Sequence, residues 1–578
     1  MAVSDWVSVE VRRAGLLAVV CAGHYTWRQL VNLEVPCPYL DEVFHAPQAQ
    51  TYWEGKWTEW DPKITTPPAL YVFSYGVNAF RAFFYEETTD AFEHNTADLR
   101  LVNLILLYVL LVALYAWAAI SRREINEQSV LQREFSFICF PLLFFFSGLY
   151  YTDVMSTLTV VITYNFWLAG VSAHGWGKVL CKAMHVCFGL VSLATRQTNI
   201  FWVAVFLGGL QVIETLNEQV GENEVHDPAI SEAYFEGQPI GLAQKTINSD
   251  ILALDFVTTA ISVGHNALRV LPRLIIDLLP QLVLLASFAA FVAWNGGVVL
   301  GKNIFSHSSN VKTEHWAGDK SNHIASIHLT QLLYFFALTI FFSWPALLPQ
   351  LSSFSLGIRS RLPRLSVLAG FTILALIIIH FNTLVHPFTL ADNRHYPFYV
   401  FRYFVIPFPR KYLLAPMYVL CGWLAITALG PVATTPTARI STTAKPKQKA
   451  DDESREIIFQ RADTVHVSFV LVFLISAALS LITAPLVEPR YFMIPWSIWR
   501  LHVPEVLESD APKQKAIGSA KDPRQPGVFI RGLELVAAQA PSIELLWYMA
   551  INIVTGYMFL YRPFAWPQEP GKLQRFMW

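Results

Sequence analysis

Long apolar runs recur along the whole chain and constrain its fold more than any other feature. A helix needs about 20 apolar residues to cross a bilayer, and we predict about 12 such segments in this sequence. The chain of 578 residues is 54% hydrophobic and only 15% charged, whereas soluble domains are about one quarter charged. We therefore expect an all-α polytopic membrane protein in which residues 1–578 form one multi-span domain. The predicted spans are 11–31, 100–120, 135–149, 152–172, 179–195, 199–215, 273–295, 328–348, 365–385, 411–432, 464–485 and 543–561.

Basic residues in short loops predict the orientation, because such loops tend to stay cytoplasmic. With twelve spans, the basic segments 352–365 and 437–461 and the C-terminal residues after 562 all fall on one side, which we predict to be cytoplasmic. Polar insertions at 216–250 and 433–460 are expected on that side, and another at 503–541 on the lumenal side. The stretch 67–84 opens with two prolines and is expected to lie on the membrane surface or to re-enter the membrane.

Unusual polar clusters gather on the predicted non-cytoplasmic side. They lie in 41–68, which belongs to a first loop at 32–99, and in 150–153, 196–199, 318–328, 386–403 and 488–496. Such a one-sided concentration indicates a polar active site at one membrane face, whereas a transporter more often places its charges at mid-membrane. The net charge of −1 argues against a nucleic-acid partner.

The first cluster, PYLDEVFH, allows three interpretations. If residues 41–52 are helical, Asp41 and His45 lie on one face. A carboxylate there could act as general base toward a sugar hydroxyl. Alternatively, Asp41 and Glu42 are first-turn acids favoured by the helix dipole, or Asp41 and His45 chelate a divalent ion. Asp61, which precedes a proline, is a turn residue or a second catalytic acid.

Basic residues in the later clusters form the counterpart. Arg394, His395 and Arg402 lie in ADNRHYPFYVFRY, and Arg490 lies in EPRYF. Arginine matches phosphate geometry well, so these residues are candidates for binding a lipid phosphate. For Arg402 in particular, the alternative is an arginine that anchors a span end by snorkelling.

Three further charged residues belong to the same clusters. Asp392 lies in the 386–403 run and is a candidate site residue. Asp153 could pair with a basic residue or a substrate hydroxyl, or it could cap the following span. Arg196 begins a span, and its position is compatible with either a structural or a functional role.

These clusters resemble one enzyme family. PYLDEVFHAPQAQ, WDPKITTPPALY, RQTNIFW, GDKSNH, HPFTLADNRHYPFYVFRY and the terminal QRFMW are similar to the endoplasmic-reticulum alpha-1,2-glucosyltransferases, which add the last glucose to the dolichol-linked oligosaccharide. The resemblance runs from the first span to the last residue and omits mainly the polar insertions, including Asn303–Ala317.

The resemblance implies a GT-C architecture with its active site on the lumenal side of the endoplasmic-reticulum membrane. It implies dolichyl phosphate glucose as the donor substrate, a diglucosylated dolichyl-diphosphate oligosaccharide as acceptor, inversion at the transferred sugar, and neither cofactor nor metal. By motif, the catalytic base is Asp41, with Glu42 as the less favoured choice. Arg394, His395 and Arg490 are then expected around the donor phosphate.

Two alternatives remain open at the level of sequence. One is a sister GT-C transferase that uses another lipid-phosphate sugar or another acceptor. The other is a lipid or sugar transporter, which predicts ionisable residues deep inside several spans. The mid-span positions of this chain are nearly all apolar.

Overall fold

The computed structural model describes residues 3–85, 95–121, 127–220, 247, 253–300, 326–350, 363–430, 465–484, 486–504, 536–537, 539–566 and 571–578. The predicted insertions 433–460 and Asn303–Ala317 lie outside these residues, as do most of 216–250 and 503–541 and the GDKSNH motif.

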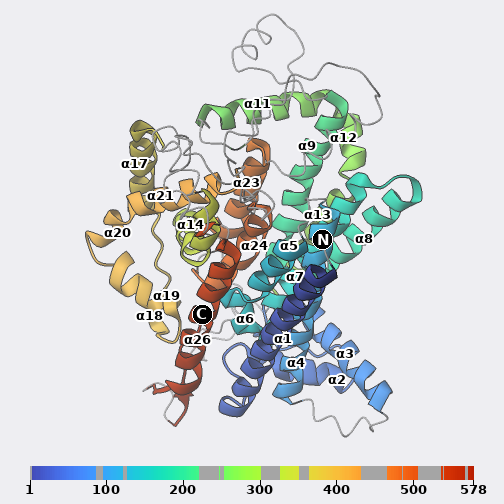
Figure 1. Cartoon of the computed structure of the whole chain (residues 1–578), viewed down its shortest axis with the longest axis vertical. Coiled ribbons are helices and arrows are strands. Elements are labelled where there is room, and N and C mark those ends of the chain that lie inside the picture. Colours follow the sequence, from blue (N-terminus) through green and yellow to red (C-terminus); the bar gives the residue numbers. More distant parts are fainter. Residues whose placement is uncertain are drawn as a thin grey trace, which may run out of the picture.

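Almost every described element is a helix (Figure 1). The α-helices are α1 (Val3–Glu34), α2 (Glu42–Trp53), α3 (Ala69–Tyr85), α4 (Thr96–Ile120), α5 (Glu127–Ile138), α6 (Pro141–Ser147), α7 (Asp153–Ser172), α8 (Gly175–Leu193), α9 (Leu207–Val220), α11 (Ala253–Arg269), α12 (Leu271–Asp277), α13 (Leu279–Asn295), α14 (Thr330–Ser343), α17 (Leu365–Asn382), α18 (Pro387–Ala391), α19 (Tyr396–Val400), α20 (Arg410–Leu413), α21 (Ala415–Thr427), α23 (Val467–Ile482), α24 (Met493–His502) and α26 (Ala540–Tyr561). Short helical segments are η1 (Gln197–Asn199), η2 (Phe201–Phe206), η4 (Trp344–Leu347), η5 (Phe401–Val405) and η7 (Pro489–Phe492). Within the described residues, the strands β1 (Phe564–Ala565) and β2 (Leu573–Gln574) form the one sheet, an antiparallel ribbon.

Several of these helices are suited to crossing a membrane. Seven described segments are long and apolar enough, namely α4, α7, α8, α17, α26 and the composite segments Gln197–Gln219 and Thr330–Gln350. The bent pair α12 and α13, which turns by 68°, makes an eighth if it is one span. The predicted all-α polytopic class is therefore confirmed. The predicted span 135–149 is instead divided between α5 and α6, because Pro141 begins a new helix there.

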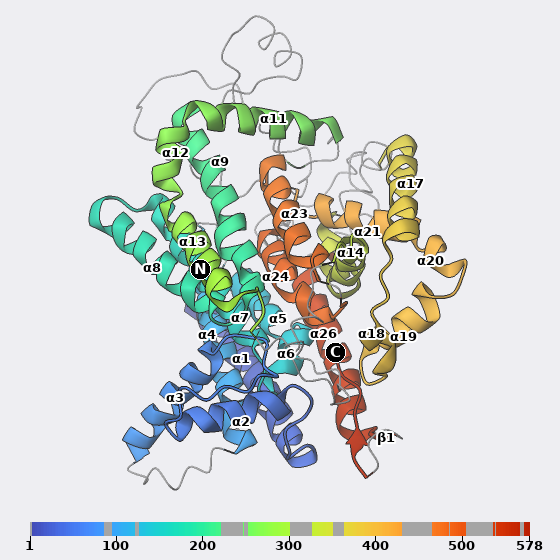
Figure 2. The same cartoon turned by 180° about the vertical axis from the view of Figure 1, so that it is seen from behind.

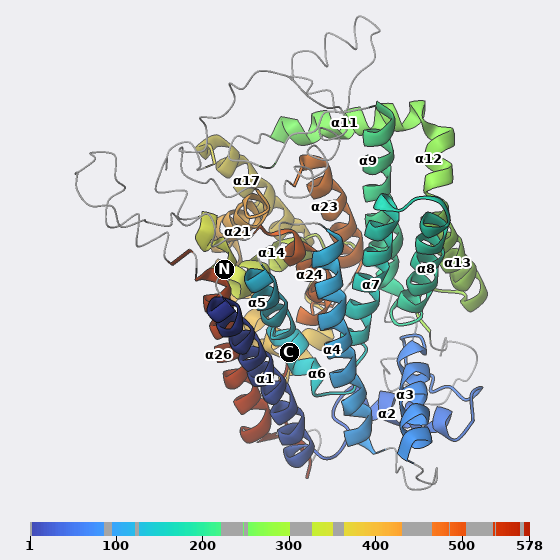
Figure 3. The same ribbon diagram turned by 45° about the vertical axis from the view of Figure 1, so that its right-hand side comes forward.

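The first and last long helices run in the same direction. Near their C-terminal ends, the ring of Trp27 on α1 packs against Phe559 on α26, with centroids 6.1 Å apart. Arg575, just beyond α26, donates to the Glu34 carbonyl at the end of α1 at 2.8 Å. Figure 3 shows the two helices side by side. With α1 as the first span predicted from the sequence (11–31), parallel first and last spans require an odd number of crossings, so the even count with a cytoplasmic C-terminal segment needs correction.

The crossing that the prediction missed is α24. Phe469 at the start of α23 contacts His502 at the end of α24, with ring centroids 4.3 Å apart, so the two helices are antiparallel. α24 has only ten residues and contains Pro495 and Arg500, so no hydropathy window of about 19 residues detects it. The charge of Arg500 is neutralised by Glu544 on α26, at 2.7 Å. A helix this short, with a charged residue inside it, is held in the bundle by its neighbours and not by its hydropathy.

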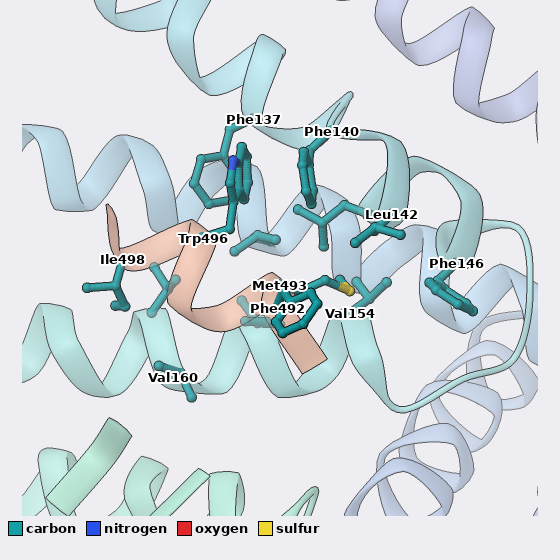
Figure 4. Close-up of a cluster of buried hydrophobic side chains, with 14 of the residues drawn as sticks. Phe137, Phe140, Leu142, Phe146, Val154, Val160, Phe492, Met493, Trp496 and Ile498 are labelled. Carbon is teal, nitrogen blue, oxygen red and sulfur yellow. The ribbon is translucent and has the colours of Figure 1, made fainter. Parts of the chain in front are cut away.

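Aromatic side chains pack closely against α24 in the protein interior (Figure 4). The Trp496 ring stacks on Phe140, with centroids 3.6 Å apart and planes within 8°. Phe137 meets the same indole at 5.0 Å. Burying large aromatic surfaces in such geometry contributes strongly to stability, and here it fixes η7, which leads directly into α24.

The ends of the 503–541 insertion lie opposite to the predicted side. Val503 and Ala540 share a small cavity with Ala346 and Pro349, at the far end of the Thr330–Gln350 segment. The first turn of that segment lies at the other end of the bundle, where Gln331 donates to the Leu486 carbonyl at 2.8 Å. The insertion therefore begins and ends on the face away from the polar clusters, because α24 adds one crossing before it.

The first loop is helical, as expected, and lies at one end of the bundle. Its described residues include α2 and α3, and the Ala69 amide donates to the Ala194 carbonyl after α8 at 2.9 Å. In Figure 2, α2, α3, α18, α19 and the β1 strand all lie toward the lower end. The fold thus brings polar loops from both halves of the chain to one face.

We predict that Lys572→Cys is modified by a membrane-impermeant maleimide from the same side of a sealed vesicle as native Cys37, because both residues are exposed at the end of the bundle that carries α2. His174→Cys, exposed in the turn after α7, should react only from the other side. Labelling is measured in a background in which the remaining cysteines are replaced. Modification of positions 572 and 174 from one side would contradict the odd number of crossings.

Candidate active site

The polar loops enclose a cavity of about 250 Å³. It lies between the start of α2, the turn before α7, the α18–α19 segment, η7 and the last two residues of the chain. Its ionisable lining residues with acidic or basic side chains are Asp41, Asp392, Arg394, His395, Glu488 and Arg490. Five of these six are candidate site residues from the sequence, so the structure brings together side chains that are far apart in the chain.

Asp41 is positioned by a tight turn before α2. The preceding Leu40 has φ 51°, a left-handed conformation that is uncommon for a residue with a branched side chain. The Asp41 amide donates to the Tyr151 hydroxyl at 3.1 Å. The carboxylate accepts a hydrogen bond from Arg490 Nη1 at 2.6 Å. Asp41 lies at the N-terminus of α2, as the helix-dipole interpretation expects, but within the part of the chain that the structure describes its carboxylate makes no capping bond to that helix.

The pKa of Asp41 reflects two opposed effects. Burial raises this pKa, but the guanidinium of Arg490 and the nearby His45 outweigh burial and lower it to about 2. The side chain remains 37% exposed to the cavity. Asp41 is therefore anionic and accessible, although a carboxylate held this firmly has little affinity for a proton.

Arg490 is one of the two arginines that line the cavity. Its Nε donates to Glu488, and its guanidinium lies over the Tyr151 ring at 5.9 Å. Burial lowers the pKa of Arg490, but Glu488 and Asp41 outweigh it and raise the pKa well above the usual value. A permanent positive charge thus lies directly beside the candidate base.

Arg394 also lines the cavity, and each of its three side-chain nitrogens donates to a protein group. Its Nε and Nη2 donate to the two oxygens of Asp392 at 2.8 and 2.7 Å. Its Nη1 donates to Gln574 Oε1 at 2.9 Å, and Trp566 lies against its guanidinium at 4.8 Å. The geometry is that of a cation whose position is fixed by protein groups on the cavity wall, and its role toward a donor phosphate stays a prediction.

His395 lies between this pair and the end of the chain. Its Nδ1 is 3.1 Å from the Trp578 carbonyl oxygen, which fixes Nδ1 as the donor. Its Nε2 is 3.7 Å from Asp392 Oδ2. The imidazole is thus oriented by two neighbours on the cavity wall.

Asp153 and Arg196 form an ion pair outside the cavity lining. Arg196 Nη2 is 3.0 Å from Asp153 Oδ1, and its Nε donates to the Thr152 hydroxyl at 3.1 Å. Asp153 is close enough to raise the pKa of Arg490. The pair lies next to the cavity wall, because Thr152 directly follows the lining residue Tyr151. The pairing interpretation of Asp153 is the one observed.

His45 is a buried neighbour of Asp41. Its Nδ1 is 2.5 Å from the Tyr71 hydroxyl. Burial lowers its pKa to about 4 although Asp41 opposes this, so the ring is neutral near pH 7. In the described residues, no group of three or more His, Cys, Asp or Glu side chains is placed to hold a metal ion.

Glu42 has a different role from Asp41. Its carboxylate is fully buried and accepts two hydrogen bonds from Arg100, at 2.9 and 2.6 Å. It also accepts from the backbone amides of Tyr39 at 3.0 Å and Tyr150 at 2.7 Å. Glu42 does not line the cavity, so its contacts are those of a structural residue.

Two other candidates lie away from the cavity. The Asp61 carboxylate accepts from the Lys63 amide at 2.9 Å, which closes a local turn as the alternative interpretation expected. Arg402 is exposed on η5 and lies over the Phe398 ring at 5.6 Å. This favours the membrane-anchoring interpretation, because the π-helical η5 directs Arg402 outward.

Sequence reasoning missed several residues of this site. Glu488 stands beside Arg490 in the EPRYF cluster, and Tyr151 stands beside Asp153 in YYTD, so both were visible but unassigned. Arg100 is the first residue of the predicted span 100–120, where a charged side chain indicates anchoring of the span end at the membrane surface. Met577 and Trp578 line the cavity, and the QRFMW motif was the signal that contained them.

Fold and site together define a multi-pass membrane enzyme with a charged cavity at one end of its helical bundle. The DIE2/ALG10 family matches residues 35–501, and the chain belongs to this family. The resemblance seen in the sequence motifs is thereby confirmed.

Curated relatives extend the match to nearly the whole chain. A protein of Aspergillus fumigatus, described as a Dol-P-Glc:Glc(2)Man(9)GlcNAc(2)-PP-Dol alpha-1,2-glucosyltransferase, is 37% identical over 96% of each chain. A similar protein of Emericella nidulans with the same description is also 37% identical. A mouse protein with this description is 30% identical over 94% of this chain and 93% of its own. No solved structure matches the chain.

We predict that Glu42→Ala lowers the free energy of unfolding by about 3–5 kcal/mol, because it leaves the Arg100 guanidinium buried without a counter-charge. Thermal unfolding of the purified protein in detergent measures the loss. Glu59→Ala, a change at an exposed position of the same loop, serves as the control. Equal stability of the two variants would contradict a structural role for Glu42.

Proposed function

We propose that the chain transfers glucose from dolichyl phosphate glucose to the diglucosylated dolichyl-diphosphate oligosaccharide and forms an alpha-1,2 linkage. The names of its family relatives describe this donor, acceptor and linkage. One observation in the structure carries the proposal, namely the contact between the Asp41 carboxylate and Arg490 at 2.6 Å inside one cavity. This arrangement supplies the two groups that an inverting transfer from a lipid phosphate requires.

In the proposed reaction, Asp41 takes the proton of an acceptor hydroxyl. The freed oxygen attacks C1 of the glucose on the face opposite the phosphate, and the bond from C1 to the phosphate oxygen breaks. The leaving dolichyl phosphate gains negative charge as this bond breaks. Arg490 is positioned to stabilise that charge, because preorganised cations in a site with little water act strongly on developing charge.

Donor binding also activates Asp41 in this scheme. In the resting site, Arg490 lowers the pKa of Asp41 to about 2 and makes it a weak base. A donor phosphate that attracts the Arg490 guanidinium weakens this ion pair. Burial then raises the pKa of Asp41, and the carboxylate becomes a competent base only when a leaving group is in place.

We further propose that the cavity faces the lumen of the endoplasmic reticulum and that the reaction needs no cofactor or metal. The side assignment rests on the loop helices and C-terminal ribbon that gather at the cavity end, and on the substrates that the relatives' names describe. The GT-C architecture remains a prediction from the resemblance. In this scheme the Arg490 guanidinium provides the positive charge that a metal ion would otherwise supply.

We predict that Asp41→Asn lowers glucose transfer by about 10²–10⁴-fold, the usual contribution of a general base, while the protein keeps its thermal stability. Transfer is measured with purified protein, dolichyl phosphate glucose and the diglucosylated lipid-linked acceptor, with and without a chelator. Asp61→Asn is the matched control, because Asp61 closes a turn away from the cavity. Wild-type turnover by Asp41→Asn would overturn the base assignment, and loss of wild-type activity with chelator would overturn the metal-free scheme.

We also predict a change in the pH dependence of kcat/KM, which reports the free enzyme. With the pKa of Asp41 lowered to about 2, the wild-type carboxylate stays deprotonated above about pH 4, so Asp41 produces no acid limb there. In Arg490→Gln, burial acts without its opposing cation, so the pKa rises and an acid limb enters the measured range. Glu488→Gln is the control, since it keeps the Asp41–Arg490 contact. An identical profile for Arg490→Gln and wild type would contradict the coupling.

A further inference from the structure

We propose that residues 574–578 are a positioning element that fixes two walls of the cavity relative to each other. The base-bearing wall is the turn that carries Asp41, and the cation-bearing wall is the segment 392–396, which carries Arg394 and His395. This inference rests on the proposed function for its kinetic consequences, but not for its geometry. After α26, the chain forms the β1–β2 ribbon, and Gln574–Trp578 then runs back to the cavity, where its last two residues form part of the lining. Figure 2 shows the ribbon below α26, on the side of α18 and α19.

One anchor of this element is Arg575 and its contact with Tyr39. The Arg575 amide donates to the Tyr39 hydroxyl at 2.7 Å, and that hydroxyl donates to the Arg575 carbonyl at 2.9 Å. Burial raises the pKa of Tyr39 to about 12, so the hydroxyl keeps the proton that it donates. Tyr39 lies two residues before Asp41, in the same turn. The backbone of Arg575 thus braces the turn that carries the base.

The Arg575 side chain fixes this anchor to the membrane bundle. Its Nη1 donates to the carbonyls of Phe559 and Leu560 at the end of α26, at 2.8 and 2.6 Å. Its Nη2 donates to the Glu34 carbonyl at the end of α1, at 2.8 Å. These carbonyls are groups that a helix leaves without an internal partner. One guanidinium therefore ties two helix ends to the Tyr39 turn.

The other anchor joins the element to the cation-bearing wall. The Gln574 side chain is nearly fully buried and accepts from Arg394 Nη1 at 2.9 Å. Asp392 holds the other edge of the same guanidinium. Gln574 and Asp392 together fix the plane of Arg394, and removing Gln574 leaves one edge without this partner.

The backbone that follows continues this anchor along the 394–396 segment. The Met577 amide donates to the Arg394 carbonyl at 2.9 Å, and the Tyr396 amide donates to the Met577 carbonyl at 3.2 Å. His395 Nδ1 lies 3.1 Å from the Trp578 carbonyl oxygen. The Trp578 ring packs on Tyr396 with centroids 4.9 Å apart. The segment thus behaves as a short added strand that sets the position of His395.

These two anchors act on different parts of the reaction. The Gln574 side positions the cations next to the donor phosphate, whereas the Arg575 side positions Asp41 next to the acceptor hydroxyl. A misplacement of about 1 Å in either wall lowers the rate strongly, because transfer requires both groups in near-attack geometry. A segment that only stabilised the fold would affect both substrates and stability together.

The test uses the full chain with Gln574→Leu, which removes the acceptor, and Gln574→Glu, which keeps an acceptor oxygen. Leu573→Gln is the matched control, because Leu573 is the 59% exposed neighbour on β2 whose side chain points to the opposite face. Steady-state kinetics vary dolichyl phosphate glucose and the acceptor separately. Hydrogen exchange followed by mass spectrometry reports the 386–403 segment without reference to activity.

We expect Gln574→Leu to raise the KM for the donor about tenfold, as for loss of a hydrogen bond to a charged group, with an unchanged KM for the acceptor and faster exchange at 392–396. Gln574→Glu should restore most of the donor affinity, and Leu573→Gln should match the wild type. Tyr39→Phe, which loosens the other anchor, should lower kcat with an unchanged KM for the donor. This variant gives an independent test if Gln574→Leu does not fold.

Equal changes in both KM values and in thermal stability, or no change in donor KM and exchange, would overturn the positioning role. If the wild type transfers no glucose but Gln574→Leu still accelerates exchange at 392–396, the proposed function fails while the positioning role stands. If the wild type is active and neither Gln574→Leu nor Tyr39→Phe shows its expected split, the positioning role fails alone.

Discussion

The buried ion pair between Glu42 and Arg100 holds the architecture around the cavity. Both side chains are fully excluded from solvent, and an isolated charge in that position would cost several kcal/mol. The cost is offset because Glu42 accepts two bonds from Arg100 and two from backbone amides, while Arg100 also donates to the Val35 carbonyl at 2.8 Å. This network joins the end of α1, the first loop, α4 and the turn before α7. This network also fixes the position of Asp41, because Asp41 directly precedes Glu42 in the same turn.

Asp41 and Glu42 show how environment separates two neighbouring acids. Both pair with an arginine, but Glu42 is sealed whereas Asp41 remains 37% exposed in a cavity. A phosphate that enters the cavity can compete for Arg490, but nothing can reach Arg100. The Asp41–Arg490 pair is therefore exchangeable and suited to chemistry. The Glu42–Arg100 pair is permanent and suited to a structural role.

The sequence was sufficient for the membrane class and for the clustering of the site. Apolar runs predicted the helical multi-span fold, and one-sided polar loops predicted that Asp41, Asp392, Arg394, His395 and Arg490 would meet. This worked because loops at one end of a bundle can meet without knowledge of helix packing.

The predictions that failed concern features that depend on contacts between distant parts of the chain. α24 was invisible because Arg500 is tolerated only through Glu544, a partner on another helix. Arg394 and Arg402 are both arginines in one sequence motif, but they face different ways. The turn between α18 and α19 directs Arg394 into the cavity, whereas the π-helical η5 directs Arg402 outward. Local hydropathy contains neither the Arg500–Glu544 pairing nor the directions of the two arginines. Because α24 was missed, the predicted number of crossings was even instead of odd.

The charge balance of the cavity links these observations to the reaction. Its lining holds the three carboxylates of Asp41, Asp392 and Glu488 against the two guanidiniums of Arg394 and Arg490, so these groups carry no excess of positive charge in the resting site. A donor phosphate can therefore bind well only by taking Arg490 from Asp41. As the phosphate leaves with an additional negative charge, Asp41 gains the acceptor proton and loses its own charge. In this arrangement the total charge of the buried site stays constant during transfer, which avoids the desolvation cost that an uncompensated charge would add.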